Sequence, residues 1–465
     1  MTATSETTAA NGQDPYRVEA GADKRLFVSM LVKDIELLPA IIDLVDNSID
    51  GARATSPGAM SQHHVQLRVE PGRFAITDDC GGIGLDVARK YAFRFGRPTD
   101  YDGLPGSVGQ FGIGMKRALF KLGREFTVTS RTATTSFVLY VDVDQWLADS
   151  DPDWQFRMQT IDTEYDPATG GGVGTEIVVT RLHESVSQDF GNSTILAQLR
   201  EQIRMRHQAA LQQGLEIKLE GERLTGFAPT LLSGPGFRPI NERFVIPEEG
   251  GEVHCHLVAG ISAAENENLD EGQAEDFRTP GDAGWWLFCN GRLLLFRERS
   301  ALTGWGDNGA AYHPQYRRFR GYVYLESLTT ELLPWNTTKT NVDQDSRVWR
   351  IVQGRMKIAL GQVQVVLNRL KNERQNAEEQ EDMPVTVASR NARPVPVEDL
   401  QPSPSVVAPP VPPKRTPKPP KTTQRIQYDV PYSRYQKAAS AMGISVISEV
   451  GRRTFDYFFD REVED

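Results

Sequence analysis

The segment that most constrains the fold is residues 37–54, LLPAIIDLVDNSIDGARA. Pro39 suits the first turn of a helix, where its missing N–H has no helical partner. Helical spacing gives one apolar face, formed by Ile41, Ile42, Val45, Ile49 and Ala52. It also gives one polar stripe, formed by Asp43, Asp46, Asn47 and Asp50. Because three carboxylates on one stripe repel each other, we expect a cation to lie against this helix.

Two glycine-rich turns follow the helix. In residues 75–84, AITDDCGGIG, an apolar strand ends in two aspartates and then glycines. In residues 106–120, GSVGQFGIGMKRALF, glycines lead directly into a helix that carries Lys116 and Arg117. Glycine lets the backbone approach a phosphate, and a helix start presents free N–H groups and a positive dipole end. The second turn is therefore predicted to bind an anion.

A divalent metal fits between such phosphates and the polar stripe. Carboxylate and amide oxygens are hard ligands of the kind that Mg²⁺ prefers. Asn47 offers such an oxygen without adding charge. An ordinary solvated helix face is the alternative interpretation of the stripe taken alone, and the two glycine turns favour a site for an anion and a metal ion.

Three motifs in this order resemble those of the GHKL ATPases, the superfamily of gyrase B, the ninety-kilodalton heat-shock chaperones, sensor histidine kinases and MutL. They are D-L-V-D-N at 43–47, D-D-C-G-G at 78–82 and G-x-x-G-x-G at 109–114. Gly174 and Thr175, before the strand EIVVT, resemble the fourth element. The resemblance implies an α+β fold that begins with a two-layer α/β sandwich of the Bergerat type and binds ATP with Mg²⁺.

The resemblance also implies roles for single residues. Asn47 would bind Mg²⁺, and Asp46 would lie beside it in the nucleotide site. Asp78 would accept a hydrogen bond from the adenine amino group, Gly82 would give the base room, and Thr175 would support Asp78. The residues expected at the phosphates are Gly109, Gly112, Gly114 and Lys116.

Two positions depart from the family pattern. Asp43 stands where most family members carry the glutamate that activates water, and its side chain is about one methylene shorter. Hydrolysis is therefore an open question, whereas nucleotide binding is expected. Cys80 replaces the usual first glycine of the second motif, and we expect a small residue packed in a tight turn.

The middle of the chain resembles the transducer domain that follows the nucleotide domain in gyrase B, MutL and Microrchidia-type ATPases. WWLFCNGRLLLF, residues 285–296, looks like the Microrchidia version, and a loop with Lys339 follows it. In that class a transducer lysine reaches the γ-phosphate, and Lys339 is the matching position. Such an ammonium stabilises phosphoryl charge. A surface lysine in a Thr/Asn-rich loop is the alternative.

Histidines and cysteines elsewhere give weak metal signals. His63 and His64 are expected to be exposed at a loop-to-strand junction. His254 and His256 share one face of a strand around Cys255, but no second ligand pair accompanies them. We therefore expect no metal at either place.

Composition limits the remaining possibilities. Three cysteines without C-x-x-C spacing suit a reducing cytoplasm, and no stretch approaches the roughly 18 apolar residues of a membrane span. A net charge of −10 argues against a wholly basic nucleic-acid coat. The chain also lacks a P-loop, a dinucleotide fingerprint, H-E-x-x-H and G-x-S-x-G.

We expect six segments along the chain. They are a flexible tail (1–20), the ATP-binding domain (21–190), a transducer-like domain (191–345), a helix (346–382), a Pro-rich basic linker (383–424) and a small interaction module (425–465). Within residues 348–370, apolar residues spaced three to four apart form a seam along one face of the expected helix. This seam could pack on the transducer or pair with a second copy. The basic helix at 193–211 could touch nucleic acid or be an ordinary solvated face.

By resemblance, the expected function is an ATP-dependent homodimeric clamp on DNA or a DNA-bound complex. Two alternatives stay open. One is a scaffold that binds nucleotide without hydrolysis and signals to a protein partner through the linker and the C-terminal module. The other is a chaperone-like clamp on protein clients.

Overall fold

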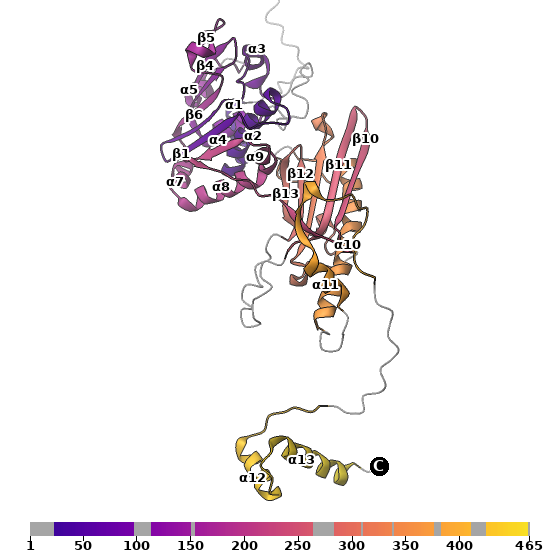
Figure 1. Cartoon of the computed structure of the whole chain (residues 1–465). Helices are drawn as coiled ribbons and strands as arrows, with labels where there is room; N and C mark the ends of the chain where they lie inside the picture. Colours follow the sequence, from indigo (N-terminus) through magenta and orange to yellow (C-terminus); the bar gives the residue numbers. More distant parts are fainter. Residues whose placement is uncertain are drawn as a thin grey trace, which may run out of the picture. The chain divides into compact units, whose positions relative to one another are not determined.

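The computed structural model describes residues 23–96, 113–149, 154–263, 283–307, 310–336, 339–375, 383–410 and 425–463. The chain forms two compact units, Met1–Pro409 and Pro410–Asp465. The first unit contains two large sheets with their helices, and the second contains two helices (Figure 1).

The first sheet has eight strands in the order β5-β4-β3-β6-β2-β1-β7-β8. Their bounds are β1 His64–Glu70, β2 Arg73–Asp78, β3 Gly123–Arg131, β4 Ser136–Asp142, β5 Met158–Asp162, β6 Gly174–Leu182, β7 Glu216–Leu219 and β8 Glu222–Arg223. All neighbours are antiparallel except β1 and β7. In β3, Phe126 and Val128 are buried whereas their neighbours are partly exposed. This alternation indicates that one face of the sheet packs on the core.

Helices cover that face. They include α1 Lys24–Lys33, α2 Leu37–Thr55, α4 Gly114–Leu122, α5 Val143–Ala148, α7 Glu184–Phe190, α8 Ser193–Arg206 and α9 Gln208–Gln212. Shorter segments are α3 Leu85–Val87, the π-helical η1 Ala88–Ala92 and α6 Pro167–Gly170. The apolar face predicted for residues 37–54 is buried in this core, where Ile41, Val45 and Ile49 pack with the strands. The predicted helix is thus confirmed.

The first core extends beyond the expected domain boundary at residue 190. Ile203 of α8, Leu215 and Ile217 of β7, and Leu224 pack in the same core as α2. β7 joins the sheet beside β1, in parallel, after α7, α8 and α9. The change in composition near residue 191 marks a crossover connection within this layer, so the boundary lies before β9, Thr230–Ser233.

The second sheet has the order β10-β11-β14-β12-β13. Its strands are β10 Ile240–Glu248, β11 Gly251–Ile261, β12 Gly284–Cys289, β13 Arg292–Glu298 and β14 Phe319–Glu326. Short 3-10 turns are η3 Ala301–Thr303, η4 Pro314–Tyr316 and η5 Thr330–Leu332. Every residue of β12 is buried, because Trp285 and Leu287 pack into one core while Trp286 and Phe288 pack into another.

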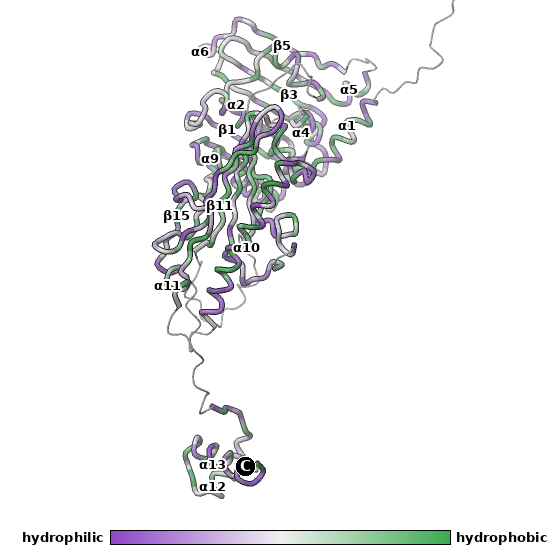
Figure 2. The backbone as a smooth tube through the Cα atoms, turned by 90° about the vertical axis from the view of Figure 1, so that its right-hand side faces the viewer, coloured by the Kyte–Doolittle hydropathy of each residue, from purple (hydrophilic) through white to green (hydrophobic). Residues whose placement is uncertain are grey.

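The long helix is α10, Arg347–Gln375. Its predicted seam is buried in the core of the second sheet: Val348, Val352, Met356, Leu360, Val363, Leu367 and Leu370. The tube of α10 alternates hydrophobic and hydrophilic stretches, as expected for a helix that covers a sheet (Figure 2). The seam therefore packs on the second sheet and does not offer itself to a second copy.

The predicted linker is wrong for its first part. Residues 383–410 pack on the second sheet through α11 Pro384–Asn391, β15 Arg393–Pro396 and η6 Val397–Asp399. β15 pairs with β9, and backbone bridges join Ser403 to Asn241 and Val407 to Arg238. Prolines are tolerated because β15 is an edge strand, where alternate N–H groups need no partner. Residues 411–424 lie outside the described residues.

The C-terminal unit is a pair of helices, α12 Tyr432–Met442 and α13 Ile447–Glu462. Gly443 ends α12 in the left-handed conformation, with φ +66°. Large side chains remain exposed in this unit: Tyr432, Ile447, Phe455, Tyr457 and Phe458. Within the described parts of the chain, no helix is both long and apolar enough to span a membrane.

Candidate nucleotide site

Asp78 ends β2 and is held by three hydrogen bonds. Ser48 Oγ donates to Oδ2 at 2.7 Å, and the N–H groups of Cys80 and Thr175 donate to Oδ1 at 3.0 and 3.2 Å. Burial raises the pKa of Asp78 above its ordinary value, and these hydrogen bonds act against the increase. Thr175 holds the Asp78 carboxylate through its backbone N–H. The carboxylate is thus oriented before any ligand arrives.

Two glycines make this orientation possible. Gly82 has φ +71°, and a Cβ there would lie 2.2 Å from the carbonyl oxygen of Arg131. Gly174 has φ +146°, and a Cβ there would lie 1.9 Å from the carbonyl oxygen of Asp78. The turn therefore packs directly on neighbouring backbone, which only glycine allows. The room that Gly82 would give an adenine ring stays a prediction.

The polar stripe of α2 divides into buried and exposed members. Asp43, Asp46 and Asp50 are buried, whereas Asn47 is exposed. The amide of Asn47 is therefore the stripe's accessible oxygen ligand. Its predicted role with Mg²⁺ remains a prediction.

Asp43 lies between two arginines from distant parts of the chain. Arg117 Nη2 of α4 is 2.7 Å from Oδ2, and Arg292 Nη1 of β13 is 3.3 Å from Oδ1. Burial alone would raise the pKa of Asp43, but the charges of Lys339, Arg292 and Arg117 outweigh it and lower the pKa. Asp43 is consequently a paired carboxylate, which is a weak base for a water proton.

Asp46 is paired with the second sheet as well. It forms an ion pair with Arg292, and Lys339 Nζ lies 3.7 Å from its Oδ2. His207 Nδ1 lies 3.8 Å from Oδ1. Burial, with the nearby charge of Arg206, lowers the pKa of His207 to about 3, so this imidazole is neutral at neutral pH. The expectation that a cation lies against the stripe is confirmed, and the cations are arginine and lysine side chains.

Lys339 reaches the stripe from a strained loop position. Its φ is +51°, in the left-handed region that non-glycine residues seldom adopt. Burial and the neighbouring Arg292 lower its pKa to about 8. The loop thus places an ammonium group beside Asp46. Its predicted contact with the γ-phosphate is untested.

The predicted phosphate loop is described only at its end. Gly109 and Gly112 lie outside the described residues, and Gly114 begins α4. A Cβ on Gly114 would lie 3.3 Å from Asp43 Oδ2, so the start of α4 lies against the stripe. Lys116 is buried, and its Nζ donates to the Ala92 carbonyl at 2.8 Å. This lysine ties α4 to η1, and its predicted phosphate contact stays a prediction.

Lys116→Met is expected to stabilise the protein at neutral and lower pH. Burial lowers the pKa of Lys116 from 10.5 to about 7. Between pH 7 and 10.5, Lys116 is protonated in the unfolded chain and neutral in the folded chain, so the stability of the unmodified protein rises with pH. Below about pH 7 the folded protein carries the full free-energy cost of the buried ammonium group. The methionine variant avoids this cost but loses the hydrogen bond to the Ala92 carbonyl. We therefore expect its free energy of unfolding to be higher by about 1–3 kcal/mol below pH 7.

Thermal unfolding of both proteins across this pH range measures the effect. Lys121→Met is the matched control, because Lys121 lies on the same helix, is less buried and donates to the Val32 carbonyl at 3.0 Å. It should give no gain at any pH. Equal shifts in the two variants would contradict the prediction.

Sequence reasoning missed four participants: Ser48, Arg117, His207 and Arg292. Ser48 follows Asn47 directly, and Arg117 follows Lys116, so both lie just after a motif, within the quoted segments 37–54 and 106–120. Arg292 and His207 come from elements whose place beside α2 is set by tertiary packing.

One further candidate region lies apart from Asp78, around His254 and His256 of β11. His254 contacts Glu252, and His256 Nε2 is 2.7 Å from Asn241 Oδ1. A cavity of about 430 Å³ beside β10 and β11 is lined in part by Arg243, His256 and Tyr324. None of the nucleotide motifs lines this cavity.

Comparison with known families agrees with the motifs. Residues 35–169 match the family described as histidine kinase-, DNA gyrase B- and HSP90-like ATPases. This match includes Asp43, Asn47 and Asp78, and it ends before Thr175. It supports the GHKL superfamily and ATP binding by this part of the chain. No curated protein matches the chain.

Proposed function

We propose, on the premise of a GHKL-type ATPase domain in residues 35–169, that this chain binds ATP with Mg²⁺ between α2 and the Asp78 turn. The hydrogen bonds that orient Asp78 carry the proposal most directly. A fixed carboxylate at a strand end is suited to accept a hydrogen bond from the exocyclic amino group of adenine. Because Ser48, Cys80 and Thr175 already hold this carboxylate, it need not reorient when the adenine ring binds.

The residues present fit a magnesium ion. Asn47 is exposed beside buried acids and offers an uncharged oxygen, and the stripe's carboxylates are already neutralised by arginine and lysine. A bound Mg²⁺ would draw its remaining ligands from phosphates and water and would neutralise phosphate charge. In this arrangement Asn47 holds the ion and Asp43 stands one helical turn away on the same face.

Hydrolysis of ATP requires a general base that takes a proton from the attacking water. Asp43 is the hypothesised base, yet it is short, and although burial raises its pKa, the charges of Lys339, Arg292 and Arg117 outweigh burial and lower the pKa. These contacts favour the alternative of a nucleotide-dependent scaffold that holds ATP as a conformational signal. Phosphate release with Mg²⁺-ATP distinguishes an ATPase from this scaffold.

The second sheet is proposed to respond to nucleotide. Arg292 and Lys339 both reach the α2 stripe from it, so a phosphate that attracts Lys339 would also change the contacts of Asp46. By analogy with Microrchidia and MutL proteins, this response would drive ATP-dependent homodimerisation and clamping on DNA, in the cytoplasm. A chaperone-like clamp on protein clients is the competing use of the same switch.

The basic face of α8 gives little support to a DNA contact. Arg200 pairs with Glu222 at 2.6 Å, and Arg204 contacts Glu201 at 3.3 Å. Their charges are thus balanced within the protein. DNA-stimulated phosphate release and salt-dependent DNA affinity test the clamp directly. If neither occurs while protein clients bind, the chaperone-like function is favoured.

Asn47→Ala and Asp78→Ala are expected to weaken Mg²⁺-ATP binding by at least about tenfold each. Asn47→Ala removes the ion's amide ligand, and Asp78→Ala removes the acceptor for the base. Binding of a fluorescent ATP analogue, with and without Mg²⁺, separates the two losses. The Asn47 effect should vanish without Mg²⁺, whereas the Asp78 effect should persist.

Glu249→Ala is the control, because Glu249 is an exposed acid in the turn after β10. It should bind like the unmodified protein. Unchanged affinity in both site variants would overturn the proposed nucleotide site.

A further inference from the structure

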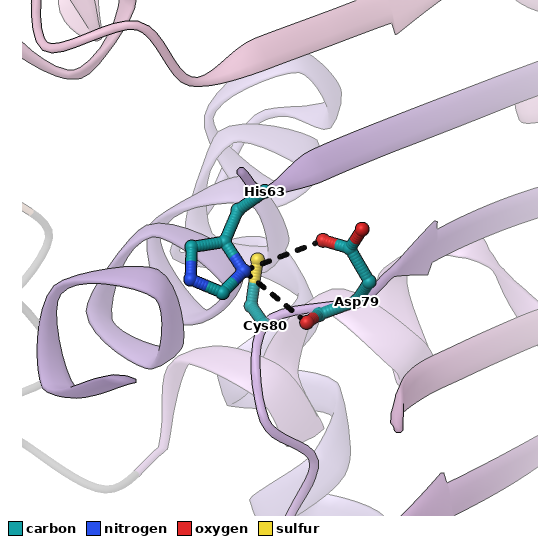
Figure 3. A group of neighbouring side chains, drawn as sticks. All are labelled: His63, Asp79 and Cys80. Atoms are coloured by element: carbon teal, nitrogen blue, oxygen red, sulfur yellow. Dashed lines mark hydrogen bonds and ion pairs between the residues drawn. The ribbon is translucent and has the colours of Figure 1, made fainter. Parts of the chain in front are cut away.

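We propose that His63, Asp79 and Cys80 bind a zinc-class divalent metal ion beside the Asp78 turn, separately from the nucleotide's magnesium. Their ligand atoms, a histidine nitrogen, a carboxylate oxygen and a thiol sulfur, all lie within 4.8 Å of one another (Figure 3). Within the part of the chain that the structure describes, this is the single group of this kind.

The β1–β2 hairpin brings these residues together. In its antiparallel register Val65 lies opposite Asp78. The pairing continues past the strand end, where Asp79 N–H donates to the His64 carbonyl at 3.3 Å. The residues before β1 therefore meet the residues after β2, which places His63 beside Cys80. The sequence did not predict this proximity, because His63 and His64 were expected to be exposed. In the structure His64 is exposed, whereas His63 is buried.

The geometry is close to that of a bound ion. His63 Nδ1 lies 3.5 Å from Asp79 Oδ1, and in Figure 3 the Cys80 sulfur lies beside the same nitrogen. Ligands at about 2.0–2.3 Å from one Zn²⁺ stand roughly 3–4 Å apart. Small rotations of the side chains would thus bring all three atoms to one ion, and water or another ligand would fill a fourth position.

Neighbouring groups hold the ligands in suitable orientations. Ser56 Oγ lies 3.0 Å from His63 Nε2 and can accept a hydrogen bond from Nε2–H, which leaves the lone pair of Nδ1 available to the ion. His64 Nδ1 lies 2.9 Å from Asp79 Oδ2, the oxygen not directed at His63. An ion would displace the contact of His63 Nδ1 with the Asp79 carbonyl, at 3.3 Å, whereas the His64 N–H, which donates to Asp79 Oδ1 at 2.6 Å, could keep its bond.

The donor set selects the class of metal. Thiolate and imidazole favour Zn²⁺ or Co²⁺ over Mg²⁺, which prefers oxygen ligands. His63 and Cys80 are buried, so the ion would be largely shielded from water. Metal binding requires the thiol to release its proton, so affinity should rise with pH.

The position gives the ion a structural effect. Cys80 N–H donates to Asp78 Oδ1, and a Cβ on Gly51 of α2 would lie 2.6 Å from the Cys80 carbonyl. An ion held by Asp79 and Cys80 would therefore stiffen the turn that orients Asp78 against α2.

Cobalt titration of the chelator-treated full chain tests the site. We expect one Co²⁺ per chain and a sulfur-to-cobalt charge-transfer absorption, both displaced by Zn²⁺ and not by Mg²⁺. Cys80→Ser should abolish the absorption, and His63→Ala should abolish tight binding. His64→Ala should weaken binding by roughly tenfold, because it acts through Asp79. Cys289→Ala and His254→Ala are the matched controls and should bind cobalt normally.

The result does not depend on ATP, so it is distinct from the proposed nucleotide function. Circular dichroism confirms that each variant is folded, and His63→Ala provides a second route if Cys80→Ser misfolds. Absence of a stoichiometric cobalt complex, or an absorption that persists in folded Cys80→Ser, would overturn the metal site.

Discussion

Asp43→Asn is expected to lower ATP turnover by about 10²-fold or more while nucleotide binding stays within a few-fold. Asparagine has the same shape, but its amide cannot take a proton from water. The exposed Asn47 and the oriented Asp78 are left intact, so the binding contacts persist. Steady-state phosphate release and binding of a fluorescent ATP analogue measure the two properties separately.

Asp50→Asn is the matched control, since Asp50 is a buried acid on the same helix, 3.5 Å from Arg53. It should retain turnover. A folded Asp43→Asn protein that hydrolyses ATP at the original rate would exclude Asp43 as the base. An unmodified protein that binds ATP and releases no phosphate would instead support the scaffold.

Asp43→Glu tests whether ATP turnover is limited by the short side chain of Asp43 or by its ion pairs. If the missing methylene limits turnover, the longer acid should raise it. If the arginine pairs limit turnover, the variant should remain slow, because Arg117 and Arg292 would still hold the carboxylate. The extra methylene in a buried site costs about 1–3 kcal/mol of stability, which thermal unfolding should show.

Local patterns predicted the parts of the site that lie within one segment. The apolar spacing in residues 37–54 predicted α2, and charge repulsion along its stripe predicted a cation there. Both follow from helix geometry and from neighbouring residues. The glycines at 82 and 174 were singled out through the resemblance to the family motifs, and the structure gives a physical reason for them, because neighbouring backbone approaches too closely for a Cβ.

Pairing between distant segments could not be predicted in this way. Nothing local distinguishes Arg292 from any other arginine at the start of an apolar strand, yet it is buried and contacts both Asp43 and Asp46. The predicted domain boundary at residue 190 was affected for the same reason, because β7 belongs to the first sheet only through its pairing with the distant strand β1. Composition misled at residues 383–410, where proline-rich sequence suited an edge strand as well as a tether.

Arg292→Ala is expected to reduce the free energy of unfolding by about 3–5 kcal/mol, the largest stability effect that we predict. Arg292 is 1% exposed and contacts two carboxylates that are themselves buried. Its removal leaves Asp46 with Lys339 at 3.7 Å and a neutral His207, and leaves Asp43 with Arg117. Denaturant-induced unfolding measures the loss.

Arg297→Ala is the matched control, because Arg297 lies on the same strand and is only partly buried. Its effect should stay within about 1 kcal/mol. The double variant Arg292→Met, Asp46→Asn should recover part of the stability, because it removes a buried charge together with its partner. If Arg292→Ala unfolds like the control, the ion pairs do not join the second sheet to α2, and the proposed nucleotide response would have to act through Lys339 alone.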